Sequence, residues 1–100
     1  MGIQLGNYNF EGPFGTIDGL RNASGVYAIL GRTPSGHYDV IDIGESATLK
    51  DRIAAHDRKD QWTRFGHPTI LAAARYSDAP SRMHIERELR ALYNPPCGLR

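Results

Sequence analysis

The sequence contains a single cysteine, Cys97, which excludes an internal disulfide and a zinc cluster of several thiolates. No apolar run approaches the ~20 residues that a membrane-spanning helix needs. The first residues also lack the basic-then-apolar order of a signal peptide. Net charge is only +1, which counts against a nucleic-acid-binding module that depends on charge alone. We therefore expect a cytoplasmic protein without a membrane partner and a structural role for Cys97.

The apolar content is sufficient for one folded domain. Hydrophobic residues make up 40% of the chain and charged residues 23%, which is ordinary for a globular protein and too apolar for a disordered one. One hundred residues leave no room for a second core, so we expect one domain over residues 1–100. Glycine, proline and asparagine punctuate residues 1–23 and predict loops with at most one edge strand. The folded module is then expected over residues 24–98.

Three segments have the composition of β-strands. Residues 25–30 and 37–43 are rich in β-forming side chains and predict an antiparallel hairpin, with its turn at residues 33–36. Residues 69–76 predict a third strand, although three consecutive alanines there also favour a helix.

A first helix is predicted from Ala47 to about Lys59. Ser46 provides a suitable N-cap, and Arg52 and His56 stand four residues apart, which places them on one face. After this helix, Trp62 and Phe65 are expected to cover the core in a short turn.

A second helix is predicted from Asp78 to about Tyr93. Asp78 is a good cap, Pro80 suits the first turn, and two prolines follow the end. Periodicity predicts an apolar stripe of Ile85, Leu89 and Leu92, beside a polar row of Arg82, Glu86 and Arg90. The predicted element order is therefore β-β-α-β-α.

Five polar side chains from four of these elements are candidates for a catalytic site: Tyr27, Asp42, Arg52, His56 and Glu86. Phosphodiester cleavage needs a base that activates water, a cation for the transition-state charge, and a metal held by carboxylate. Spacing alone does not assign these roles, because no pair has diagnostic metal-ligand spacing.

Each candidate also has a structural interpretation. Tyr27 suits half-buried packing, and His56 suits a cation at a helix C-terminus. Arg52 could form an ion pair with a neighbouring aspartate, and Glu86 could bridge Arg82 and Arg90 on a solvated helix face.

Several short motifs resemble the GIY-YIG nuclease family when they are taken in chain order: Gly25-Val26-Tyr27, Asp42-Ile43-Gly44, Ser46, Arg52, His56, and Glu86 nine residues before Pro95. The resemblance extends over about residues 24–98. It implies a small α/β domain of the α+β kind, with a three-stranded antiparallel sheet flanked by helices. It also implies a metal-dependent endonuclease that hydrolyses DNA phosphodiester bonds by water attack.

The resemblance further implies a role for each matching residue. Tyr27 would act as general base or position the attacking water, and His56 would act as a base or proton shuttle near that water. Arg52 would neutralise the transition-state oxygens. Glu86 would hold one Mg²⁺ or Mn²⁺ ion, which keeps several waters and needs few protein ligands. Gly44 would permit a tight turn.

The sequence departs from the family pattern at Asp42, where the second motif has tyrosine. Asp42 could be a second metal ligand beside Glu86, a base, or a partner for Arg52. The alternative function is a catalytically degenerate module on the same fold that binds nucleic acid or a protein partner.

Lys50, Arg58 and Lys59 are the residues that we expect to contact DNA. They belong to a stretch, residues 50–64, that carries five lysines or arginines against three aspartates. A solvated face of mixed charge is the structural alternative. Trp62, Tyr76 and Tyr93 could stack on bases, but core positions are more common for such aromatics. The chain shows no separate specificity domain, so target choice would come from loops, a protein partner or a second copy of the chain.

Overall fold

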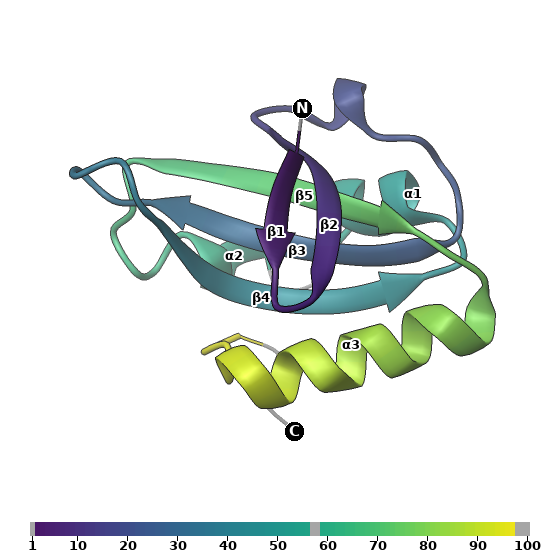
Figure 1. Ribbon diagram of the computed structural model, residues 1–100. Helices are drawn as coiled ribbons and strands as arrows, with labels where there is room; N and C mark the ends of the chain where they lie inside the picture. The colour runs from purple at the N-terminus through teal and green to yellow at the C-terminus, as the bar shows by residue number, and fades with distance from the viewer. Residues whose placement is uncertain (1, 57–58, 98–100) are drawn as a thin grey trace.

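Five antiparallel strands form one sheet in the order β1-β2-β5-β3-β4, with helices on both faces (Figure 1). The computed structural model describes residues 2–56 and 59–97. The elements are β1 (Gly2–Leu5), β2 (Tyr8–Phe14), the 3-10 turn η1 (Ile17–Gly19), β3 (Gly25–Arg32), β4 (Tyr38–Ser46), α1 (Leu49–Ala54), α2 (Lys59–Trp62), β5 (Thr69–Tyr76) and α3 (Ala79–Tyr93). The α+β class is confirmed, whereas the prediction of three strands is wrong.

The sheet separates two apolar cores, so the expectation that one hundred residues leave no room for a second core is wrong. β3 lies between β5 and β4 and is buried on both faces from Gly25 to Gly31. Its alternate residues therefore serve different cores: Tyr27 and Ile29 face α1 and α2, whereas Val26 and Ala28 face α3. Residues buried on both sides of a sheet form a nearly continuous hydrophobic run, which explains the apolar composition of this segment.

The N-terminal segment contributes two of the five strands, so the expectation of mostly loops over residues 1–23 is wrong. Leu5 pairs with Tyr8 around a two-residue turn, in which Gly6 adopts a positive φ of 57°. Apolar residues alternate on either side of this turn, and Leu5 and Phe10 are buried in the core beneath α3. β2 then pairs with β5, which joins the hairpin to the sheet. The many glycines and asparagines conceal this alternation.

The first helix is shorter than predicted. α1 ends at Ala54, and α2 is a separate turn beginning at Lys59. Ser46 belongs to β4 and is not the N-cap, a position that Thr48 occupies. The first-turn amides of α1 bond instead to a preceding loop: the Leu49 amide donates to the Ala23 carbonyl at 3.0 Å, and the Asp51 amide to Asn22 Oδ1 at 3.1 Å.

The second helix confirms its predicted start and end. Asp78 Oδ1 accepts a hydrogen bond from the Ser81 amide at 3.0 Å, as an N-cap does. Asn94 adopts the left-handed conformation, with φ of 48°, and ends the helix. The predicted stripe is correct for Ile85 and Leu89, which are buried, and wrong for Leu92, which is 60% exposed.

The third predicted strand is confirmed as β5, and the alanines explain how it fits. Ala72, Ala73 and Ala74 are buried in a strand that lies between β2 and β3 under helices on both faces. Small side chains suit such a position, so burial overrides the helix propensity of alanine.

The edge strand β4 contains a bulge beside the candidate site. Ile29 pairs with Asp42 and Leu30 pairs with Val40, which leaves Ile41 as the extra residue. The Ile41 carbonyl accepts a hydrogen bond from the Cys97 amide at 3.0 Å. Cys97 is buried in the core on the α1 and α2 face, which is consistent with a structural role. In the described part of the chain, no helix has the length and hydropathy that crossing a bilayer requires.

Candidate functional site

Two of the predicted site residues, Tyr27 and His56, contact each other directly. The Tyr27 hydroxyl and His56 Nε2 share a hydrogen bond, and the rings meet edge to face with centroids 5.4 Å apart. The donor depends on which imidazole nitrogen carries the proton. Tyr27 is 1% exposed and His56 5% exposed, so the pair lies within the core beneath α1 and α2.

Gly44 makes room for this pair. It lies inside β4 opposite Tyr27, so the expectation that it forms a tight turn is wrong. A β-carbon at Gly44 would overlap the Tyr27 phenol ring and hydroxyl. Glycine is therefore required here for close approach of a ring to the backbone.

His56 reaches this position because the chain leaves α1 before it. The helix ends at Ala54, and the His56 amide donates a long bond of 3.4 Å to the Ile53 carbonyl. His56 is therefore not on a helix face shared with Arg52, as the four-residue spacing predicted. Its ring packs against that of Trp62, with centroids 4.6 Å apart.

Trp62 connects His56 to Asp42. The indole Nε1 donates to Asp42 Oδ2 at 2.8 Å. Trp62 is therefore a core residue, as the structural alternative held, whereas Phe65 is 47% exposed and does not cover the core.

Arg90 forms an ion pair with Asp42. Its Nη2 donates to Asp42 Oδ1 at 2.9 Å, and its Nε donates to Glu86 Oε2 at 3.0 Å. Nη1 donates to the Cys97 carbonyl at 3.3 Å. One guanidinium thus bonds both carboxylates that sequence reasoning assigned to a metal.

The environment of Asp42 explains this arrangement. Asp42 is 0% exposed, and a buried carboxylate is costly unless a charge and hydrogen bonds compensate it. Arg90 supplies the charge and Trp62 a second donor. The row partner Arg82 serves another carboxylate, since its Nε donates to Glu45 Oε2 at 2.5 Å.

The fit to a divalent metal rests on Glu86. Across residues 2–56 and 59–97, no cluster of three or more His, Cys, Asp or Glu side chains has the geometry of a metal site. Asp42 already accepts from Trp62 and Arg90 and is fully buried, which makes it a poor second ligand. Glu86 is half-buried at the outer end of the network, and a single carboxylate with waters is an accepted arrangement for Mg²⁺.

Two of the residues predicted to contact DNA lie on two consecutive short helices. Lys50 lies on α1, whereas Lys59 begins α2 and its Nζ donates to the Ala54 carbonyl at 2.7 Å. Arg58 lies outside the described residues. Arg52 is half-buried on α1, and its role in the site stays a prediction.

The other two aromatic candidates have structural contacts. The Tyr76 hydroxyl accepts from the Arg21 amide at 2.8 Å, and the Arg21 guanidinium lies 3.9 Å from the ring centroid. The Tyr93 hydroxyl accepts from the Gly6 amide at 3.0 Å. Both rings therefore secure the N-terminal segment to the rest of the fold.

Sequence reasoning missed Arg90 and Trp62 as members of the site. Arg90 was visible four residues after Glu86, a spacing that predicts their bond. Its bond to Asp42 has no local sequence signal, because the two residues are 48 positions apart. Comparison of the chain with protein-family models, curated proteins and solved structures gave no match. The family resemblance therefore rests on the motif residues alone.

Proposed function

We propose that this chain is a metal-dependent endonuclease that hydrolyses DNA phosphodiester bonds by water attack. The observation that carries the proposal is the hydrogen bond between the Tyr27 hydroxyl and His56 Nε2. A phenol joined to an imidazole can pass a proton to and from a water molecule, because a neutral imidazole has one nitrogen that accepts a proton and one that donates. Both residues belong to the motifs that resemble a nuclease family.

The remaining roles follow from the chemistry of the side chains. Arg52 would bind two non-bridging phosphate oxygens, since a guanidinium stays charged and its donors are planar. Glu86 would hold Mg²⁺ or Mn²⁺, which supplies stabilisation of the leaving oxygen when bound. Arg90 keeps the Glu86 carboxylate oriented by bonding it through Nε. A cytoplasmic location suits an enzyme that acts on DNA and has one thiol.

The test is a cleavage assay on single-stranded, double-stranded, flapped and branched DNA. We expect cleavage with Mg²⁺ or Mn²⁺ and none with a chelator. Glu86→Gln and Arg52→Ala should each lower the rate roughly 100-fold, as loss of a charge-stabilising group does. Glu88→Gln and Arg87→Ala are matched controls on α3 and should keep the wild-type rate. Failure to cleave every substrate would sink the proposal, as would wild-type rates in the Glu86 and Arg52 variants.

A non-catalytic binding module is the second candidate. Two observations favour it: the guanidinium of Arg90 lies between Asp42 and Glu86, and Tyr27 and His56 are almost fully buried. This candidate predicts binding of DNA or a protein partner without cleavage. Titration with Mn²⁺ separates the nuclease from the binding module. A nuclease must bind Mn²⁺ and lose that binding in Glu86→Gln, whereas a binding module has no such requirement.

A further inference from the structure

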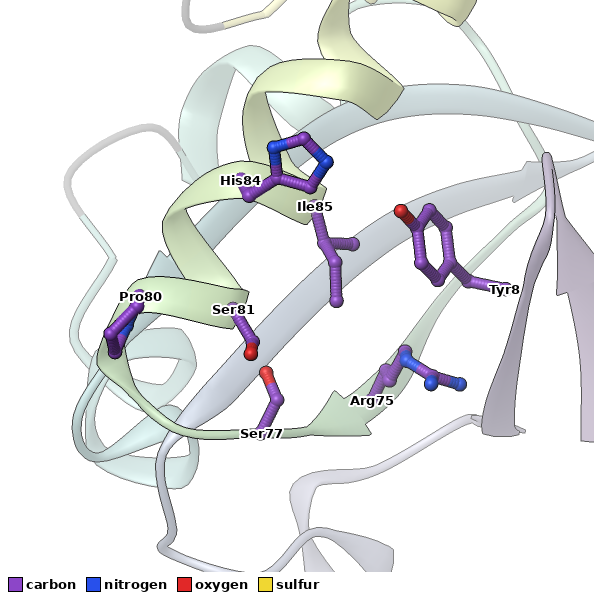
Figure 2. Close-up of a pocket in the computed structure, with 7 residues that line it drawn as sticks. All are labelled: Tyr8, Arg75, Ser77, Pro80, Ser81, His84 and Ile85. Atoms are coloured by element: carbon purple, nitrogen blue, oxygen red, sulfur yellow. The ribbon is translucent and has the colours of Figure 1, made fainter.

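A pocket apart from the candidate site lies between the first turns of α3, the start of β2 and the end of β5 (Figure 2). Its volume is about 460 Å³, within the range typical of small-molecule sites. The residues that line it are Tyr8, Arg75, Ser77, Pro80, Ser81, His84 and Ile85. None of them belongs to the network that runs from Tyr27 to Glu86.

Arg75 brings an uncompensated positive charge to this pocket. Its Nη1 donates to the Asn9 carbonyl at 3.0 Å, and its guanidinium lies 5.2 Å from the centroid of the Tyr8 ring. Arg75 Nε is buried and has no hydrogen-bond partner among the described residues. No carboxylate in those residues lies within ion-pair distance of it. An anionic group bound at this guanidinium would compensate its charge.

Ser77 supplies a second unsatisfied group. Its hydroxyl is buried and has no partner in the described ranges. Figure 2 shows the hydroxyls of Ser77 and Ser81 directed toward each other at the junction of β5 and α3. This junction is held in place, because the Ser77 amide donates to the Ser24 carbonyl at 3.0 Å and Ser24 Oγ donates to the Ser77 carbonyl at 2.6 Å.

The other walls of the pocket are apolar or aromatic. Ile85 and the Tyr8 ring face each other across it, and the His84 ring lies at its upper rim in Figure 2. Rings and branched side chains of this kind bind flat aromatic groups.

Two carboxylates near the pocket are already engaged. Asp78 accepts from the Ser81 amide at 3.0 Å. Glu88 accepts from the Tyr8 hydroxyl at 3.2 Å and lies 3.4 Å from His84 Nε2. Burial, followed by the hydrogen bond to Glu88, raises the pKa of Tyr8 above its ordinary value of 10.0, so its hydroxyl remains a donor.

We infer that this pocket binds a nucleoside monophosphate unit, with the phosphate at Arg75 and Ser77 and the base against Tyr8 and Ile85. The donors and the charge select the phosphate, whereas the volume and the aromatic walls select the base. The unit can be a free mononucleotide or the phosphorylated end of a DNA strand. The inference does not depend on nuclease activity, because it uses none of the candidate catalytic residues.

The test is titration of the ¹⁵N-labelled full chain in the presence of a chelator, followed by NMR. The probes are inorganic phosphate, dAMP, an oligothymidylate with a 5′-phosphate, and the same oligomer without it. We expect the amides of residues 75–85 to shift with each phosphorylated probe. Tighter binding of the phosphorylated oligomer than of dAMP would identify a strand end as the ligand. Tighter binding of dAMP would identify a free nucleotide. Both results support the pocket.

Variants give the second arm of the test. Arg75→Gln should weaken binding of dAMP about tenfold or more, because a charged hydrogen bond is lost. Ser77→Ala should also weaken binding of dAMP, although it removes no charge. This variant keeps the test valid if Arg75→Gln fails to fold. Arg87→Gln, on the same helix, is the matched control. The inference is overturned if roughly 10 mM dAMP shifts no amide signals. It is also overturned if both pocket variants bind dAMP with unchanged affinity, or if a phosphoserine peptide binds as tightly as dAMP.

Discussion

Arg90 on α3 and Asp42 on β4 form an ion pair of 2.9 Å between residues 48 positions apart. Asp42 is fully buried and bonds to Trp62 of the core beneath α1 and α2, whereas Arg90 comes from the helix on the other face. The pair therefore crosses the β4 edge of the sheet. It connects the two helical layers through one guanidinium.

Replacement of Arg90 by glutamine should destabilise the fold strongly. The change removes a hydrogen-bonded counter-charge from the buried carboxylate of Asp42, and breaking a buried ion pair on one side costs about 3–5 kcal/mol in the free energy of unfolding. Urea denaturation followed by circular dichroism measures this. The double variant Asp42→Asn with Arg90→Gln removes both charges and should recover part of the loss. A double variant less stable than Arg90→Gln alone would show that the pair is not the cause.

Trp62→Phe should remove the indole donor to Asp42 Oδ2 while keeping most of the aromatic packing. Loss of a hydrogen bond to a buried carboxylate is expected to lower the free energy of unfolding by about 1–3 kcal/mol. Thermal and urea unfolding give the value. Phe65→Leu, at an exposed aromatic of the same segment, is the control and should stay within about 0.5 kcal/mol of wild type.

Gly44→Ala should displace the Tyr27 ring. The new methyl group would overlap the phenol, and overpacking of a core position typically costs about 1–3 kcal/mol. The ¹³C-resolved NMR signals of Tyr27 and His56 should shift, and urea unfolding should report the stability loss. Gly15→Ala is a suitable control, because the nearest atom to its new methyl is Leu71 Cδ2 at 3.7 Å. Unchanged stability and signals in Gly44→Ala would contradict the packing described for this pair.

Acid should weaken the start of α3. Hydrogen bonds from Ser81, through its side chain and then its amide, hold the pKa of Asp78 below its ordinary value of 3.8. The folded state therefore binds this proton less readily than the unfolded state. The contribution of Asp78 is complete above the unfolded pKa and is lost as pH falls through the folded pKa.

Asp78→Asn isolates this contribution, because asparagine caps a helix about as well without ionising. The wild type should lose stability relative to the variant as pH falls below about 4. The measurement is the urea midpoint of both proteins from neutral pH into the acid range. Parallel pH profiles would exclude Asp78 as the source of acid sensitivity.

The strands β3, β4 and β5 and the second helix were predictable because their signals are local. The capping aspartate and the prolines define α3, and a run of β-forming residues defines β3. The N-terminal hairpin was missed because Gly6 and Asn7 act as a tight turn between alternating apolar residues, whereas their frequency suggested loops. The break after α1 was missed as well, because the spacing of Arg52 and His56 also fits a continuous helix.

Only part of the membership of the candidate site was predictable, because Arg90 and Trp62 were missed. The motifs identified Tyr27 and His56, and the structure brings them into contact. They also identified Asp42 and Glu86, but their link through Arg90 depends on the path of α3 past the sheet edge. No sequence spacing encodes that contact, because tertiary packing sets it. Asp42 needs a guanidinium because it is buried. That burial also arises only in the assembled fold.

The bond from the Cys97 amide to the Ile41 carbonyl also occupies a backbone acceptor on the edge strand β4. An edge strand offers unpaired backbone groups that favour β-strand addition and aggregation. At β4, the bulge interrupts that ladder, and the C-terminal segment occupies one of its acceptors beside Asp42. Within the described ranges, the opposite edge is β1, four residues long and paired with β2 alone. Backbone groups open to strand addition are therefore left at the N-terminal hairpin, away from the buried ion pair.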